Sequence, residues 1–310
     1  MAMSKPDTLM ECLTCSHLKT AGNWIVVEPI VSTENDISIY RLESNAGCYE
    51  CKVSGLRWAC KKKVTLQYHF RSWDPHKTVL QSMGYRQAGP LMDVKITAGR
   101  LEELHLPHFA CFGVEHHNNP SIKQSVRVLH VEDNNVSIEK VDKVTRFHVK
   151  ILPPSVSMRG VILQALGFSV HTEMLIYQDR TAHLTLRAYL IPYDPALTET
   201  VEKQEKRLGS TRILKPRPEN TLWLTADYKL KTTCPSDIES SVNPKRLELA
   251  HINLPHYYKV FIKEAAFDFR LNLCCMGRKQ LKWSQEIQEA EYRKPPPDNP
   301  DQQNQPDVEG

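Results

Sequence analysis

The stretch "VTLQYHFRSW", residues 64–73, decides the fold class because its apolar and polar residues alternate strictly. One face would carry Val64, Leu66, Tyr68 and Phe70, and the other Thr65, Gln67, His69 and Arg71. A period of two is typical of a β-strand with one face in the core and the other facing solvent.

The same alternation recurs along the chain, in "KVTRFHVKIL", "AHLTLRAYLIPYD", "HYYKVFI" and "AAFDFRLNL". Turn-forming sequences such as "WDPH", "QAGP" and "EDNN" separate these runs. Many short strands with frequent turns predict a mainly β fold of two consecutive β-sandwich subdomains. We expect one short helix, capped by Thr198 and ended by Gly209 in a left-handed conformation.

The predicted division is residues 1–156 for the first sandwich, 157–293 for the second and 294–310 for a tail. The placement of about the first 40 residues within the first unit is open. The tail, "KPPPDNPDQQNQPDVEG", has almost nothing apolar to bury, so we expect it to be disordered.

Composition excludes several classes of protein. No apolar run approaches the roughly 18 residues that a membrane span requires, and the N-terminus has no secretory signal pattern. The formal net charge is +4, from 40 basic and 36 acidic residues, and no basic stripe with interleaved aromatic residues predicts nucleic-acid binding. Nine cysteines without a secretory signal are typical of reduced thiols, so we expect a cytoplasmic protein without a cofactor.

Two CxxC pairs, Cys12/Cys15 and Cys48/Cys51, are the candidate ligands for a zinc ion held by four thiolates. The 32 residues between the pairs exceed the roughly 15–20 of a compact zinc ribbon. This spacing favours ordinary strand packing of the cysteines over a metal site.

Two further constellations could carry nucleophilic chemistry. Cys111 lies near His105, His108, His116 and His117, but strand alternation accounts for these residues without catalysis. His130, Glu139 and Ser157 lie at or near the ends of consecutive strand-like runs, so one sheet could bring them to a common edge.

The chain resembles the function-to-find domain (FIIND) of inflammasome sensors, in the version found in large fish receptor repertoires. The resemblance is carried by "GCYECKVSGLRWACKKKVTLQYHFRSWD", "AGPLMDVKITAGRLEELHLPHFACFG", "LHVEDNNVSIEKVDKVTRFHVKILPPSVSMRGVIL" and "LRAYLIPYDPALTETVEKQEKRLG". It covers roughly Cys48 to Tyr292. The family consists of an ankyrin- and netrin-receptor-type sandwich followed by a sandwich called UPA.

The resemblance implies self-cleavage by an N-to-O acyl shift between Val156 and Ser157. The family's catalytic histidine lies 27 residues before the nucleophilic serine, and its orienting glutamate nine residues after that histidine. His130, Glu139 and Ser157 match this spacing, so they would serve as general base, orienting group and nucleophile. The departure is Val156, where the family usually has phenylalanine, because a β-branched residue crowds its own carbonyl.

The resemblance also implies partners: the chain's own fragments, which would remain associated, other UPA- or FIIND-containing chains, and dipeptidyl peptidases. It implies a role in inflammasome or cell-death signalling and no cleavage of other proteins. One alternative is an interaction module that does not cleave itself, or a decoy that lacks a CARD effector. Another is a binding protein stabilised by zinc.

Overall fold

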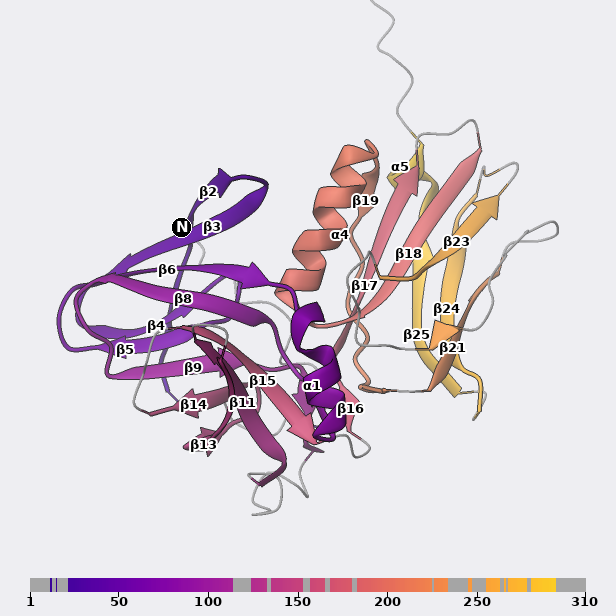
Figure 1. Ribbon diagram of the computed structural model, residues 1–310. Coiled ribbons are helices and arrows are strands. Elements are labelled where there is room, and N and C mark those ends of the chain that lie inside the picture. The colour runs from indigo at the N-terminus through magenta and orange to yellow at the C-terminus, as the bar shows by residue number, and fades with distance from the viewer. Residues whose placement is uncertain are drawn as a thin grey trace, which may run out of the picture.

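The computed structural model is built from β-strands (Figure 1). The residues it describes are 12, 15, 22–113, 124–132, 135–152, 157–164, 168–179, 183–224, 226–233, 245–246, 255–262, 265, 267–277 and 280–293.

The first sandwich has a large sheet that contains residues 64–71 of the alternating stretch. Its strands in spatial order are β12 (Asn135–Lys140), β11 (Val126–Glu132), β15 (Met158–Gln164), β8 (Leu91–Ala98), β6 (Val64–Arg71), β3 (Ile37–Ser44) and β2 (Ile30–Glu34), and β7 (Tyr85–Gln87) also pairs with β15. In β6, Leu66 and Tyr68 are fully buried while Arg71 is exposed, as the alternation predicts, but Thr65, which was expected to face solvent, is also buried.

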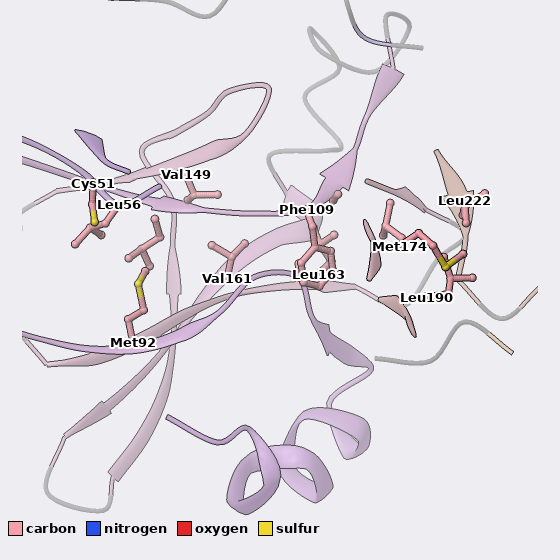
Figure 2. Close-up of a cluster of buried hydrophobic side chains, with 14 of the residues drawn as sticks. Cys51, Leu56, Met92, Phe109, Val149, Val161, Leu163, Met174, Leu190 and Leu222 are labelled. Carbon is pink, nitrogen blue, oxygen red and sulfur yellow. The ribbon is translucent and has the colours of Figure 1, made fainter. Parts of the chain in front are cut away.

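A second sheet faces the first. Its strands are β1 (Ile25–Val27), β4 (Gly47–Cys51), β5 (Arg57–Cys60), β9 (Glu103–Pro107), β14 (His148–Ile151) and β13 (Lys143–Val144). Apolar side chains from both sheets form the core between them; Figure 2 shows Val149 of β14 on one side and Val161 and Leu163 of β15 on the other. Fully burying each such side chain contributes about 1.5–3 kcal/mol.

The outer face of the large sheet is also covered where β8, β11 and β15 lie together. The 3-10 helix η2 (Asp74–His76) and helix α1 (Lys77–Ser82) pack there. Trp73, Leu80, Leu91, Leu129, Val131 and Ile162 form a separate apolar cluster. Strand β15 is therefore buried on both of its faces.

A small sheet joins the two halves of the chain. It consists of β10 (Ala110–Cys111), β16 (Ser169–Val170) and β20 (Leu222–Trp223). Its central strand immediately precedes the second sandwich, so this sheet holds the first sandwich against the start of the second.

The second sandwich pairs two four-stranded sheets (Figure 1). One sheet contains β19 (Thr211–Ile213), β17 (Thr172–Asp179), β18 (Leu184–Pro192) and β23 (Tyr257–Ile262). The other contains β22 (Lys245–Arg246), β21 (Asp227–Thr232), β24 (Phe269–Cys275) and β25 (Gln280–Ile287). Helix α5 (Glu289–Tyr292) follows β25.

Helix α4 (Pro195–Arg207) begins earlier than the sequence predicted. Its N-cap is Asp194, whose carboxylate accepts a hydrogen bond from Ala196 N at 2.9 Å, and Pro195 occupies the first turn. Thr198 lies inside the helix and donates instead to Glu173. Gly209 does adopt the predicted left-handed conformation, with φ +71°.

The mainly β class with two sandwiches is confirmed, but the described residues form three α-helices, α1, α4 and α5, where the sequence predicted one. The structural division differs from the predicted one at 156/157, because β15 follows Ser157 and is hydrogen-bonded within the first sandwich. The expected tail, 294–310, lies outside the described residues. In the described part of the chain, no helix is long and apolar enough to cross a membrane.

Candidate active site

His130 and Glu139 are brought together by the hairpin of β11 and β12. In this hairpin Glu139 lies opposite Val128, so it is a diagonal neighbour of His130 on the same face of the sheet. The ring nitrogen Nδ1 of His130 lies 2.7 Å from Glu139 Oε1. An Nδ1–H that donates to the carboxylate leaves Nε2 with the lone pair that a general base requires.

Arg159 holds the carboxylate from its other side. It lies directly opposite His130 in the pairing of β11 with β15. Its Nη1 donates to Glu139 Oε2 at 2.8 Å, and its side chain is almost fully buried. Burial lowers the pKa of Arg159, and the adjacent Glu139 acts in the opposite direction.

Ser157 directly precedes β15, two residues before Arg159, so strand alternation places both side chains on the same side of the sheet. Its Oγ accepts a hydrogen bond from Arg159 Nε at 3.3 Å. Arg159 thus contacts Ser157 and Glu139, and its Nη2 lies 3.5 Å from His130 Nδ1. The three predicted residues are gathered around one guanidinium that sequence reasoning missed.

The Nε2 atom of His130 is buried and has no hydrogen-bond partner. The carboxylate of Glu132 lies 3.7 Å away, which is beyond hydrogen-bonding distance, and its side chain is mostly exposed. A buried imidazole nitrogen without a partner, together with a serine hydroxyl and a carboxylate that share Arg159 as a neighbour, has the composition of a Ser–His–carboxylate site. Val156, the other half of the expected cleavage site, lies outside the described residues.

The alternation of side chains along a β-strand could have identified Arg159 as a neighbour of Ser157. Strand alternation that continues from Ser157 places residue 159 on the same face. The contact with His130 also requires the register between β11 and β15, which spacing in the sequence does not give.

The remaining candidates from the sequence are separated. Cys48 is exposed, whereas Cys51 is buried with its Sγ 3.2 Å from the Tyr68 hydroxyl. The two CxxC pairs, considered as zinc ligands and disfavoured by their spacing, do not come together, since Cys12 and Cys15 lie with Cys111 and His171 and not with the second pair.

The histidines expected near Cys111 have other partners. His105 Nε2 lies 3.0 Å from Glu103 Oε2, and His108 Nε2 lies 3.0 Å from the carbonyl oxygen of Thr145. His116 and His117 lie outside the described residues. These contacts favour the prediction that strand structure accounts for His105 and His108.

Comparison with known proteins supplies the family. The "Function to find" model matches residues 33–169, and the "UPA-FIIND domain" model matches residues 170–287. The boundary between the two models lies within β16, after β15.

Curated relatives match over most of the chain. A "NACHT, LRR and PYD domains-containing protein 1 homolog" of Danio rerio is 30% identical over 254 residues, which are 81% of this chain and 18% of the relative. "NACHT, LRR and PYD domains-containing protein 1b allele 5" of Mus musculus is 24% identical over 258 residues, 79% of this chain and 21% of the relative. The chain thus spans about a fifth of the length of these relatives, and it belongs to the FIIND family, with a FIIND domain followed by a UPA-FIIND domain.

Proposed function

We propose that this chain is a self-cleaving regulatory module that cuts its own backbone once, between Val156 and Ser157. The observation that carries the proposal is the hydrogen-bonded set of Ser157, Arg159, Glu139 and His130, with the buried Nε2 of His130 unpartnered.

In the proposed reaction, His130 Nε2 takes the proton from the Ser157 hydroxyl, and Oγ attacks the carbonyl carbon of Val156. The C–N bond breaks as the imidazolium returns the proton to the nitrogen, which gives an ester on Ser157 Oγ and a free α-amine. Water then hydrolyses the ester, restores the hydroxyl and leaves a carboxylate on Val156.

Each group around the site has a separate task. Glu139 positions His130 through Nδ1 and stabilises the imidazolium that forms. Arg159 is a positioning residue, because it fixes both the carboxylate and the serine. A general base contributes about 10²–10⁴-fold, and attack within one chain supplies effective molarities of about 10⁵–10⁸ M.

Proton transfer requires one local rearrangement. Ser157 Oγ is hydrogen-bonded to Arg159 in the described structure and not to His130. For cleavage, Oγ must leave Arg159 and come within about 2.6–3.2 Å of His130 Nε2, the reach of a general base. The β-branched side chain of Val156 would slow the attack on its own carbonyl.

The biological setting follows from the family. We propose a role in inflammasome-type signalling in the cytoplasm, through binding of other proteins, including UPA- or FIIND-containing chains and dipeptidyl peptidases. A second function, an interaction module that stays intact, is favoured by the Ser157–Arg159 hydrogen bond and by the departure at Val156.

Intact mass and a denaturing gel of the purified full-length protein test the proposal. Self-cleavage gives two fragments of nearly equal length and a new N-terminus reading "SMRGVIL". Ser157→Ala abolishes the fragments, while Ser32→Ala, at an exposed serine of β2, leaves them unchanged. A single intact chain in all three proteins after prolonged incubation would refute cleavage and favour the interaction module.

A further inference from the structure

Three cysteines and one histidine from distant parts of the chain meet where the two sandwiches join. They are Cys12, Cys15, Cys111 and His171, and one potential ligand atom from each lies within 4.8 Å of the others. All four residues are buried, with exposed fractions between 1% and 7%.

The spacing of the donor atoms fits a tetrahedral zinc ion. With Zn–S distances of about 2.3 Å and Zn–N distances of about 2.0–2.1 Å, neighbouring donors lie about 3.5–3.8 Å apart. Cys15 Sγ lies 3.7 Å from His171 Nε2. Thiolate and imidazole ligands select zinc over the oxygen-preferring Mg²⁺ and Ca²⁺.

The backbone presents these side chains from well-anchored positions. Cys15 N donates to Cys12 O at 3.1 Å, and the two thiols lie within 4.8 Å of each other. Cys111 lies on β10, paired with Ser169 of β16. His171 follows β16 directly, and its N–H donates to Phe109 O at 2.8 Å.

The surroundings also match the charge of a metal centre. Three thiolates and one Zn²⁺ carry a net charge of −1, and the buried guanidinium of Arg146 offsets it, because its Nε donates to Cys15 Sγ at 3.1 Å. The ring of Phe147 packs edge-on against His171, with centroids 5.2 Å apart, and excludes water from that side. Such outer contacts orient ligands and tune the metal.

We propose that Cys12, Cys15, Cys111 and His171 bind one structural zinc ion that fastens the N-terminal segment to the junction of the FIIND and UPA-FIIND domains. The two cysteines of the CxxC pair precede the family match, Cys111 belongs to the first domain, and His171 belongs to the second. A closed site with four protein ligands has no open position for substrate, so its role is structural.

The zinc site has a consequence that rests on the proposed function. Three ligands precede Ser157 and one follows it. After cleavage, the ion would therefore be coordinated by both fragments and would link them without a covalent bond. Removing zinc would then weaken the association of the fragments.

Elemental analysis of the purified full chain, grown with added zinc, tests the site. We expect about one zinc per chain in the wild type and in Ser157→Ala, since binding does not depend on cleavage. Cys48→Ser, at an exposed cysteine of the other CxxC pair, retains the metal. Cys111→Ser and His171→Ala lose at least about tenfold in zinc affinity, as expected for the loss of a ligand.

Two further measurements keep the test decisive if a variant fails to fold. Replacement of zinc by Co²⁺ in the wild type gives the strong visible absorption of tetrahedral cobalt with thiolate ligands, and a chelator removes it and lowers the melting temperature. Cys111→His, which keeps a zinc-binding side chain, retains the metal. A folded, monomeric wild type without bound zinc, or with a Cys12–Cys15 disulfide in its place, would overturn the proposal.

Discussion

Replacing Glu139 with glutamine tests how the candidate base is oriented. Two contacts decide the outcome: Arg159 Nη1 donates to one carboxylate oxygen at 2.8 Å, and His130 Nδ1 lies 2.7 Å from the other. Arg159 has only donors, so the amide oxygen of Glu139→Gln must face it. The amide NH₂ then faces Nδ1 and donates to it.

That arrangement inverts the tautomer of His130. Nδ1 becomes the acceptor, the proton moves to Nε2, and Nε2 can no longer accept a proton from Ser157. We expect loss of the general-base contribution, a decrease of about 10²–10⁴-fold in the cleavage rate. At about 1.36 kcal/mol for each tenfold change, the activation barrier rises by about 3–5 kcal/mol.

The assay is a time course of cleavage after cell-free synthesis, followed by intact mass. Glu132→Gln is the matched control, because its carboxylate lies 3.7 Å from Nε2 and is mostly exposed. We expect the control to cleave within about threefold of the wild-type rate, since exposed ion pairs contribute little. If the Glu139→Gln protein has the melting temperature of the wild type and also cleaves at the wild-type rate, the orienting role of Glu139 is refuted.

Three further substitutions, one of them with a matched control, test β15 next to Ser157 and the start of α4. Arg159→Lys keeps the charge but not the two-point contact, so urea unfolding should show a loss of about 1–3 kcal/mol and cleavage should slow by about 10²-fold. Gly160→Ala puts Cβ 2.4 Å from the Trp73 ring and should lower the free energy of unfolding by about 1–3 kcal/mol. The control Gly277→Ala, whose Cβ meets nothing within 4 Å, should leave the urea midpoint nearly unchanged. Burial raises the pKa of Asp194 from 3.8 to about 7, so the folded state binds the extra proton and the free energy of unfolding falls as pH rises from about 4 through 7. Asp194→Asn should remove about 2–3 kcal/mol of that fall between pH 5 and 8, and an equal slope in both proteins would contradict the assignment.

The strands were predictable where one face is buried, as β6 illustrates with Leu66 and Tyr68 inside. The start of α4 was missed because the capping role of Asp194 depends on its own burial and on Pro195 after it. A sequence pattern identifies residues that can cap a helix, but tertiary packing selects among them.

Contacts between distant segments were the least predictable. The CxxC pair of Cys12 and Cys15 was visible in the sequence, but its companions, Cys111 and His171, lie on segments brought near only by the pairing of β10 with β16. Spacing rules for zinc describe compact motifs and do not apply to ligands 156 residues apart. Arg159 was missed for the same reason, because its contact depends on strand register.

The position of β15 explains how one cut could leave the fragments associated. The strand starts directly after Ser157, yet it pairs with β11 from Met158 to Leu163, with β8 at its start and with β7 at its end. Its Val161, Ile162 and Leu163 are buried, at about 1.5–3 kcal/mol each, so pulling it from the sheet would cost up to about 5–9 kcal/mol in lost burial alone. A cut before β15 therefore removes the covalent link but leaves this strand bound in the first sandwich. Separation then requires the extraction of β15, and a partner that competes for β11 or β8 would promote it.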